Sequence, residues 1–220
     1  MKVVTIIDYK EGGNLFSVNN SLEYLGVKTT ISSNPDEILK ASKVIFPGVG
    51  SFTKAINQIT NLDLKEAIKS KALSGDPFMG ICVGMQVLFE SSSETHGAND
   101  SDIAGLGILK AKVEKFPENQ EFKIPQIGWN AISLDKERDN PLFKGINDGA
   151  FFYFVHSFMV NYSYTASLLK QFPQASFTKT DYSCPFISSY WNGENLFACQ
   201  FHPEKSAENG LKVLENFVGL

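Results

Sequence analysis

Residues 77–89 read Pro-Phe-Met-Gly-Ile-Cys-Val-Gly-Met-Gln-Val-Leu-Phe, and this stretch is predicted to hold a strand, a sharp turn and a helix. The apolar run 77–80 suits the end of a buried strand, and Met85, Leu88 and Phe89 then recur at helical spacing. Cys82 lies between two glycines, so it falls on the turn. Free N–H groups and partial positive charge at a helix start favour a thiolate and stabilise an oxyanion. The stretch therefore predicts a nucleophilic cysteine between a strand and a helix.

A second motif, Phe-His-Pro-Glu at 201–204, follows a later predicted strand. It offers an imidazole as base and a carboxylate two residues further on that can orient it. Taken singly, Cys82 is equally compatible with an inert buried thiol, and the His-Pro-Glu segment with a surface loop. Together the two motifs predict a thiol-dependent acyl-transfer enzyme.

Strand and helix patterns alternate through the first half of the chain. Predicted strands cover 3–8, 27–31, 43–46 and the run into Cys82, and predicted helices cover 14–25, a short segment from Asp36, 52–59 and 64–73. Asn14 is expected to cap the first helix and Gly26 to end it. Such alternation predicts an open, mostly parallel sheet with helices on both faces and a ligand site beyond the carboxyl ends of its strands. Asp8, the turn at 47–50 and Cys82 should therefore meet in one crevice.

The second half of the chain has a different pattern, with short aromatic strands expected to be largely antiparallel. They are predicted at 107–116, 130–134, 151–155, 186–191 and 196–201, with a closing helix at 206–218 and surface loops at 91–102 and 135–140. No linker-like stretch divides the chain. We therefore expect residues 1–220 to form one α/β domain with a smaller antiparallel portion in the second half.

Composition narrows the function classes. The net charge is −4 and the basic residues are scattered, which disfavours nucleic acid as a partner. No apolar run approaches the roughly 18 residues of a membrane span and no signal segment is evident, so a cytoplasmic protein without membrane contact is expected. The three cysteines, Cys82, Cys184 and Cys199, lack the spacing of a disulfide framework or a zinc site. We expect neither a metal nor a cofactor, and dinucleotide and Walker patterns are absent from the sequence.

Five motifs in order resemble those of the triad, or class I, glutamine amidotransferases. They are Pro-Gly-Val-Gly-Ser-Phe at 47–52, Gly-Ile-Cys-Val-Gly-Met-Gln at 80–86, Gly-Trp-Asn at 128–130, Tyr-Phe-Val-His-Ser at 153–157 and Gln-Phe-His-Pro-Glu-Lys-Ser at 200–206. The similarity spans essentially the whole chain, and it is strongest to glutaminase subunits of imidazole glycerol phosphate synthases. It implies the flavodoxin-like fold of that family and hydrolysis of L-glutamine to glutamate and ammonia through a cysteine thioester. It also implies a synthase or cyclase subunit as partner, in a heterodimer, that receives the ammonia.

The resemblance implies roles for ten residues. The triad would be Cys82, His202 and Glu204; the oxyanion hole would be formed by Val49, Gly50 and Val83; and Gln86, Glu94, Ser157 and Phe158 would contact glutamine. For Glu94 a solvated loop carboxylate is the alternative. His156 is at least as compatible with a core histidine bonded to a backbone carbonyl as with a functional one.

The chain also departs from the family pattern. The turn at 8–15 carries an extra residue and charge, and Gln126, Phe158 and the pair Ala198-Cys199 replace usual family residues. None of these residues is in the triad. They leave two ammonia acceptors possible, the substrate of a cyclase in histidine biosynthesis or a sugar nucleotide. A stand-alone γ-glutamyl thiol hydrolase and a non-catalytic scaffold are further alternatives. Trp129 could line a partner interface or belong to the core, and the turn at 47–50 could flip when the partner is loaded.

Overall fold

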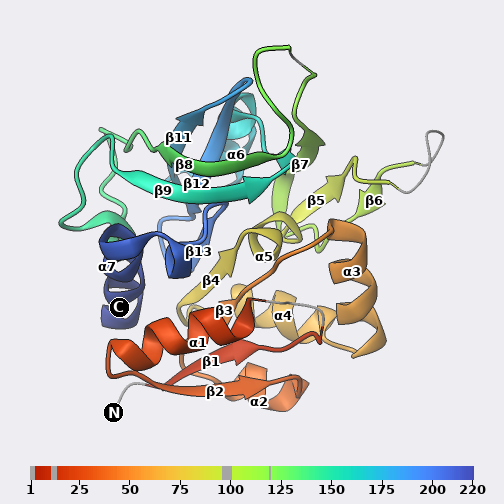
Figure 1. Ribbon diagram of the computed structural model, residues 1–220. Coiled ribbons are helices and arrows are strands. Elements are labelled where there is room, and N and C mark those ends of the chain that lie inside the picture. The colour runs from red at the N-terminus through yellow and green to blue at the C-terminus, as the bar shows by residue number, and fades with distance from the viewer. Residues whose placement is uncertain (1–2, 11–13, 96–100, 119) are drawn as a thin grey trace.

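The computed structural model describes residues 3–10, 14–95, 101–118 and 120–220 (Figure 1). Within them, seven strands form the main sheet, in the order β11-β12-β13-β4-β3-β1-β2. Their bounds are β1 Val3–Ile7, β2 Lys28–Ser32, β3 Val44–Phe46, β4 Phe78–Ile81, β11 Ser176–Asp181, β12 Pro185–Trp191 and β13 Leu196–Cys199. The pairs from β13 to β2 are all parallel, whereas β11 and β12 are antiparallel to their neighbours.

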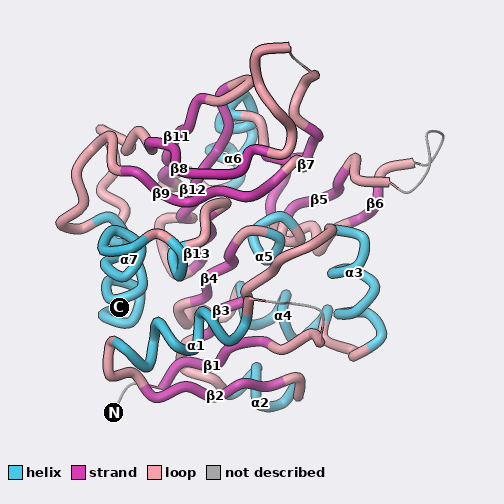
Figure 2. Tube along the Cα trace, in the orientation of Figure 1, coloured by secondary structure: helices cyan, strands magenta, loops and turns pink. Residues whose placement is uncertain are grey.

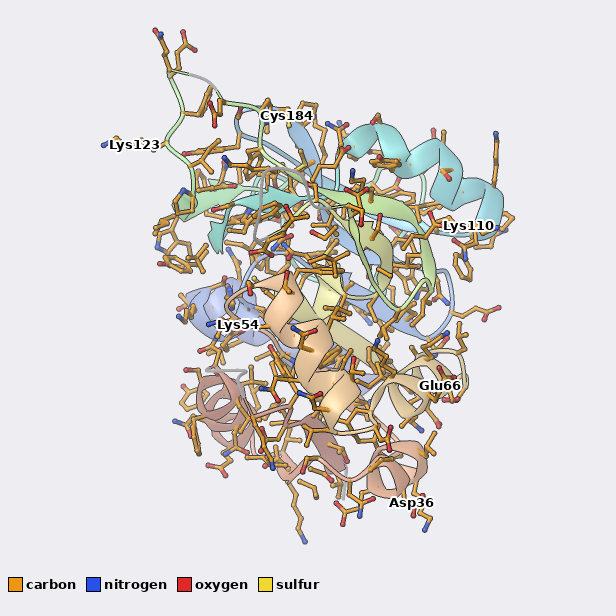
Figure 3. The ribbon with its side chains drawn as sticks, turned by 90° about the vertical axis from the view of Figure 1, so that its right-hand side faces the viewer. Asp36, Lys54, Glu66, Lys110, Lys123 and Cys184 are labelled. Carbon is orange, nitrogen blue, oxygen red and sulfur yellow. The ribbon has the colours of Figure 1, made fainter. Side chains whose placement is uncertain are left out.

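Helices cover both faces of this sheet. They are α1 Leu15–Tyr24, α2 Pro35–Lys40, α3 Phe52–Asn61, α4 Lys65–Ala72, α5 Val83–Gln86, α6 Thr165–Gln171 and α7 Ala207–Gly219. Figures 1 and 3 place α1 and α7 on one face and α2 and α4 on the other. The predicted open, mostly parallel α/β sheet is therefore confirmed.

Two smaller sheets complete the upper half of the molecule (Figure 2). One has the order β10-β7-β5-β6 and the other pairs β8 with β9. The bounds are β5 Phe89–Ser92, β6 Ile103–Ala104, β7 Leu109–Lys115, β8 Gln126–Ala131, β9 Phe151–His156 and β10 Phe158–Met159. Short 3-10 helices lie at Pro141–Phe143, Tyr162–Tyr164 and Pro203–Lys205. The antiparallel portion expected in the second half is thus present.

Several sequence expectations differ from this structure. β13, placed among the antiparallel strands, pairs in parallel with β4 and so joins the two halves of the main sheet. The segment 91–102, expected to be a loop, begins inside β5, and its residues 96–100 lie outside the described part of the chain. β8 begins at Gln126, earlier than expected, because Gln126 and Gly128 continue its pairing with β9.

Strand β11 was not predicted because three of the four side chains it buries are polar. Ser176, Thr178 and Thr180 all face the interior. Thr178 Oγ1 bonds the hydroxyls of Ser188 and Ser189 on β12, and Thr180 Oγ1 donates to the Ala131 carbonyl. A hydroxyl that finds a partner can be buried at little cost, so the strand needs no apolar alternation.

Lys43 holds the end of α7 against the sheet. Its buried ammonium donates to the carbonyl oxygens of Phe217 at 3.0 Å and Val218 at 2.8 Å, and it lies 5.6 Å from the centre of the Phe217 ring. A cation at a helix C-terminus is favoured by the helix dipole, and the carbonyls would lose their partner without it.

We therefore expect Lys43→Met to lower the free energy of unfolding by about 2–4 kcal/mol, measured by urea denaturation. The matched change Lys54→Met, at an exposed lysine of α3 (Figure 3), should cost less than about 0.5 kcal/mol. Equal losses in the two variants would contradict this role for Lys43.

Candidate active site

Cys82 occupies a strained turn between β4 and α5. Its φ is 53° and its ψ is −111°, and its N–H donates to the Cys199 carbonyl at 2.7 Å. Such a conformation is costly for a residue with a side chain and persists only where its surroundings enforce it. The turn is enforced by close backbone packing, since a Cβ on Gly48 would lie 2.6 Å from the Gly84 nitrogen and one on Gly84 would overlap the Phe46 carbonyl oxygen.

His202 and Glu204 follow β13, beside Cys82. The Glu204 Oε1 lies 2.7 Å from Nδ1 of His202, and both side chains are fully buried. The His202 backbone N–H donates to the Tyr153 carbonyl at 2.9 Å, and Ser206 Oγ donates to the His202 carbonyl at 2.6 Å. These bonds fix the imidazole between β9 and the start of α7. Among the described residues, Nε2 of His202 has no hydrogen-bond partner.

Asn14 completes the environment of Glu204. Its Nδ2 donates to Glu204 Oε1 and lies 3.3 Å from His202 Nδ1. Asn14 is the N-cap residue of α1, as expected, but its side chain makes no capping bond. Asparagine is common before helices, so the local pattern gave no signal for a contact with residues so far along the chain.

The charges around His202 outweigh its burial. Burial lowers the pKa of this imidazole, but the neighbouring Cys82 sulfur and Glu204 carboxylate raise it to about 10. His202 is therefore protonated at neutral pH when Cys82 carries a negative charge.

Cys82 and His202 line one cavity of about 280 Å³. Of the ten residues assigned roles, all except Glu204 line it, and Glu204 stands behind His202. Asp8, which was expected in the same crevice, is not among the lining residues. The other lining residues are Val49, Gly50, Val83, Gln86, Glu94, Ser157, Phe158, Pro125, Val155 and His156. The structure thus brings together residues from both halves of the chain, beyond the carboxyl end of β4.

Several of these residues already make internal bonds. Gln86 Nε2 donates to the Phe158 carbonyl and to Gln200 Oε1, each at 3.0 Å. Glu94 Oε2 accepts from the Phe52 N–H at 2.7 Å, at the start of α3. Glu94 is therefore not the solvated loop carboxylate that was the alternative. The Val83 N–H donates to the Gly48 carbonyl at 3.3 Å, so this N–H is occupied here.

His156 lies at the edge of the same cavity. Its Nδ1 donates to the Phe158 carbonyl at 2.8 Å, and its ring packs against Phe116, Phe154 and Phe186. His156 is therefore a core histidine bonded to a backbone carbonyl, one of the two roles expected for it. Burial lowers the pKa of His156 to about 4, and the charge of His202 adds to that effect.

The pKa of His156 predicts a loss of stability in acid. The unfolded histidine takes up a proton below about pH 6.5, whereas the folded one does so only near pH 4. Stability contributed by the neutral ring is therefore present above about pH 6.5 and is lost as the pH falls toward 4. Between pH 7 and pH 4.5, the free energy of unfolding should fall by about 2–3 kcal/mol less in His156→Gln than in the wild type, measured by urea denaturation. An equal loss in wild type and variant would contradict this account.

Two features are absent from the described residues. No helix there is both long and apolar enough to cross a bilayer. Nor do three or more His, Cys, Asp or Glu residues in that part of the chain gather as a metal ion would require.

The parallel sheet, the strained cysteine turn and the buried His-Glu pair define a class. The family model for class-I glutamine amidotransferases matches residues 5–219, and the chain belongs to that family. The imidazole glycerol phosphate synthase subunit HisH of Methanosarcina mazei is 43% identical over 219 residues, 99% of this chain and 98% of that protein. HisH of Methanocaldococcus jannaschii is 43% identical over 218 residues, 99% of this chain and 100% of that protein. The structure of PurLQS from Thermotoga maritima shares the fold, with a TM-score of 0.69 and 17% identity over 100% of this chain and 99% of that one.

Proposed function

We propose that this chain is a glutaminase subunit that hydrolyses L-glutamine at Cys82 and passes the ammonia to a synthase subunit. One observation carries the proposal: Cys82 and His202 share a cavity, with Glu204 on the far side of the imidazole. That arrangement supplies a nucleophile, a proton carrier and a group that orients the carrier.

The reaction follows from these positions. The Cys82 thiolate attacks the side-chain amide carbon, and His202 holds the thiol proton and then gives it to the departing amine. Ammonia leaves and a glutamyl thioester remains on Cys82. His202 then takes a proton from water, which attacks the thioester and releases glutamate. Gln86, Glu94, Ser157 and Phe158 line the cavity where the amino-acid end of glutamine would bind.

The oxyanion formed in each attack needs backbone donors from Val49, Gly50 and Val83. A donor of this kind contributes about 3 kcal/mol in other enzymes. The Val83 N–H now bonds the Gly48 carbonyl, so this bond must break before Val83 can serve. Gly50 has a φ of 98°, a conformation that glycine adopts freely. The turn at 47–50 would therefore rearrange when the partner subunit carries its own substrate.

The outer face of β8 and β9 is the proposed docking surface for the synthase subunit. Ile127, Trp129 and Phe151 are 63%, 51% and 55% exposed, and Trp129 packs edge-on against Tyr153 of β9. Trp129 is therefore not a core residue. The His202 N–H bonds the Tyr153 carbonyl, so this surface connects directly to the site. Ammonia is mostly protonated in neutral water. A subunit docked here could receive the ammonia before it takes up a proton from bulk water.

We expect Ile127→Asp with Trp129→Ala to weaken binding of the synthase subunit at least about tenfold, measured by calorimetry, because large exposed aromatic residues dominate interfaces. The control Phe16→Asp changes an apolar residue that is 74% exposed. It belongs to α1, a helix that lies away from β8 (Figure 1). It should bind normally. Equal weakening by the control would place the interface elsewhere.

The similarity to HisH supports the cyclase of imidazole glycerol phosphate synthase as the partner subunit. The two subunits would form a heterodimer that acts in histidine biosynthesis in the cytoplasm. The test is glutamate release by the chain mixed with that cyclase and its substrate, together with transfer of glutamine nitrogen to the product. Release without transfer would favour a paralogous pair that acts on a sugar nucleotide. Full release by the chain alone, with activity on γ-glutamyl peptides, would favour a stand-alone thiol hydrolase. No release under any condition would overturn the proposal.

A further inference from the structure

Gln200 lies between β13 and His202 and is completely buried, with 0% of its surface exposed. Its backbone N–H donates to the Ser188 carbonyl at 2.9 Å, which fixes the residue to β12. Its side-chain amide lies between Gln86 and Cys82. Nε2 is 3.5 Å from the Cys82 sulfur, and Oε1 is 3.0 Å from Gln86 Nε2.

We propose that Gln200 is a positioning residue that donates a hydrogen bond to the Cys82 sulfur, and that Gln86 fixes the direction of this bond. The inference rests on the proposed role of Cys82 as the nucleophile and adds a residue that the reaction scheme above does not use.

The direction of the bond follows from one backbone group. The Phe158 carbonyl can only accept, so the nitrogen end of the Gln86 amide must face it. The same nitrogen then donates its second hydrogen to the neighbouring Gln200 atom, which must be the oxygen. The NH₂ end of Gln200 is left to face sulfur. Reversing Gln200 would place two NH₂ groups against each other and leave the sulfur facing a carbonyl oxygen.

A donor aimed at sulfur favours the thiolate over the thiol, because the charged sulfur is the stronger acceptor. The surroundings are dry, since Gln86 and Cys82 are also buried. His202 lines the same cavity as Cys82, and its Nε2 has no hydrogen-bond partner among the described residues. Gln200 would therefore stabilise the negative charge on the Cys82 sulfur during attack and hold the sulfur aimed into the cavity.

The test compares two variants in a Cys184→Ser background. Gln200→Glu has nearly the same shape and still accepts from Gln86, but turns an acceptor toward sulfur. Gln200→Met fills the space without any donor. The readout is the pH profile of Cys82 alkylation by iodoacetamide, located by peptide mass spectrometry. We expect the midpoint to move to higher pH in both variants and the rate at pH 7 to fall at least about tenfold.

The control Gln171→Glu makes the same change on α6, where the side chain bonds Ile108 and Lys110. Its alkylation profile should match that of the parent. An unchanged midpoint in folded Gln200→Met overturns the inference, even if Gln200→Glu shifts, because a buried charge would then be the cause. Gln200→Leu replaces the Met variant if that one does not fold. Alkylation needs no glutamine, so a failure of the proposed glutaminase activity can be told apart from a failure of this inference. In that case the parent would release no glutamate, but the alkylation midpoint would still shift in the Gln200 variants.

Discussion

Replacing Cys82 with alanine should abolish glutamate release from glutamine while leaving the fold intact. Among the described residues that line the cavity, the Cys82 sulfur is the one thiol, and the one hydroxyl is that of Ser157, between β9 and β10. Losing the nucleophile of a comparable triad costs about six orders of magnitude in turnover. Alanine fills almost the same space and leaves the strained turn to the surrounding backbone. Glutamate release, measured with the synthase subunit present, should fall below detection.

The control for Cys82→Ala is Cys184→Ser. Cys184 is a half-buried thiol at the end of the molecule opposite Asp36 (Figure 3). Burial and the charge of Glu114 raise the pKa of its thiol, so it is mostly uncharged at neutral pH. This variant should keep full activity. Activity that survives Cys82→Ala, or that is lost in Cys184→Ser, would move the nucleophile away from position 82.

Gly84→Ala is expected to damage both the turn and the stability. The new methyl group would overlap the Phe46 carbonyl oxygen, which is backbone and cannot swing away. Either β3 or α5 must move, and a shift of α5 misplaces Cys82. We expect a loss of about 3 kcal/mol in the free energy of unfolding, the upper part of the range for overpacked sites. Glutamate release from the remaining folded protein should fall at least about a hundredfold.

Gly219→Ala is the matched control, because a Cβ there meets no atom within 4 Å. Its stability and activity should stay close to those of the wild type. Should Gly84→Ala behave like this control, then the close approach of β3 to α5 would not be what holds the turn.

Most of the fold could be predicted because apolar residues in the first half of the chain recur at the spacings of strands and helices. Buried β-branched and aromatic strands alternate with helices, and Cys82 follows directly from its two glycines. Strand β11 was missed because hydroxyl groups replace apolar side chains on its inner face. The exposure of Trp129 could not be predicted from the sequence either, because a large aromatic side chain has the same local sequence pattern in a core and at an interface.

The candidate site was harder to predict in its contacts than in its residues. The resemblance indicated most of the cavity-lining residues, but not Pro125, Val155 and His156. Nor did it indicate that the Val83 N–H is already bonded or that Asn14 reaches Glu204. Both depend on pairing between distant segments. Gln200 did carry a usable signal, because it stands in the motif at 200–206, two residues before His202.

The most direct test of the account is covalent labelling with a glutamine analogue that has a chloroketone in place of its side-chain amide. A thiolate that attacks glutamine at the side-chain carbonyl should also displace chloride from this reagent. We predict one label per chain, on the peptide that contains Cys82, blocked by excess glutamine and absent from Cys82→Ala. Labelling of Cys184 or Cys199 instead, or labelling that glutamine does not block, would contradict the account.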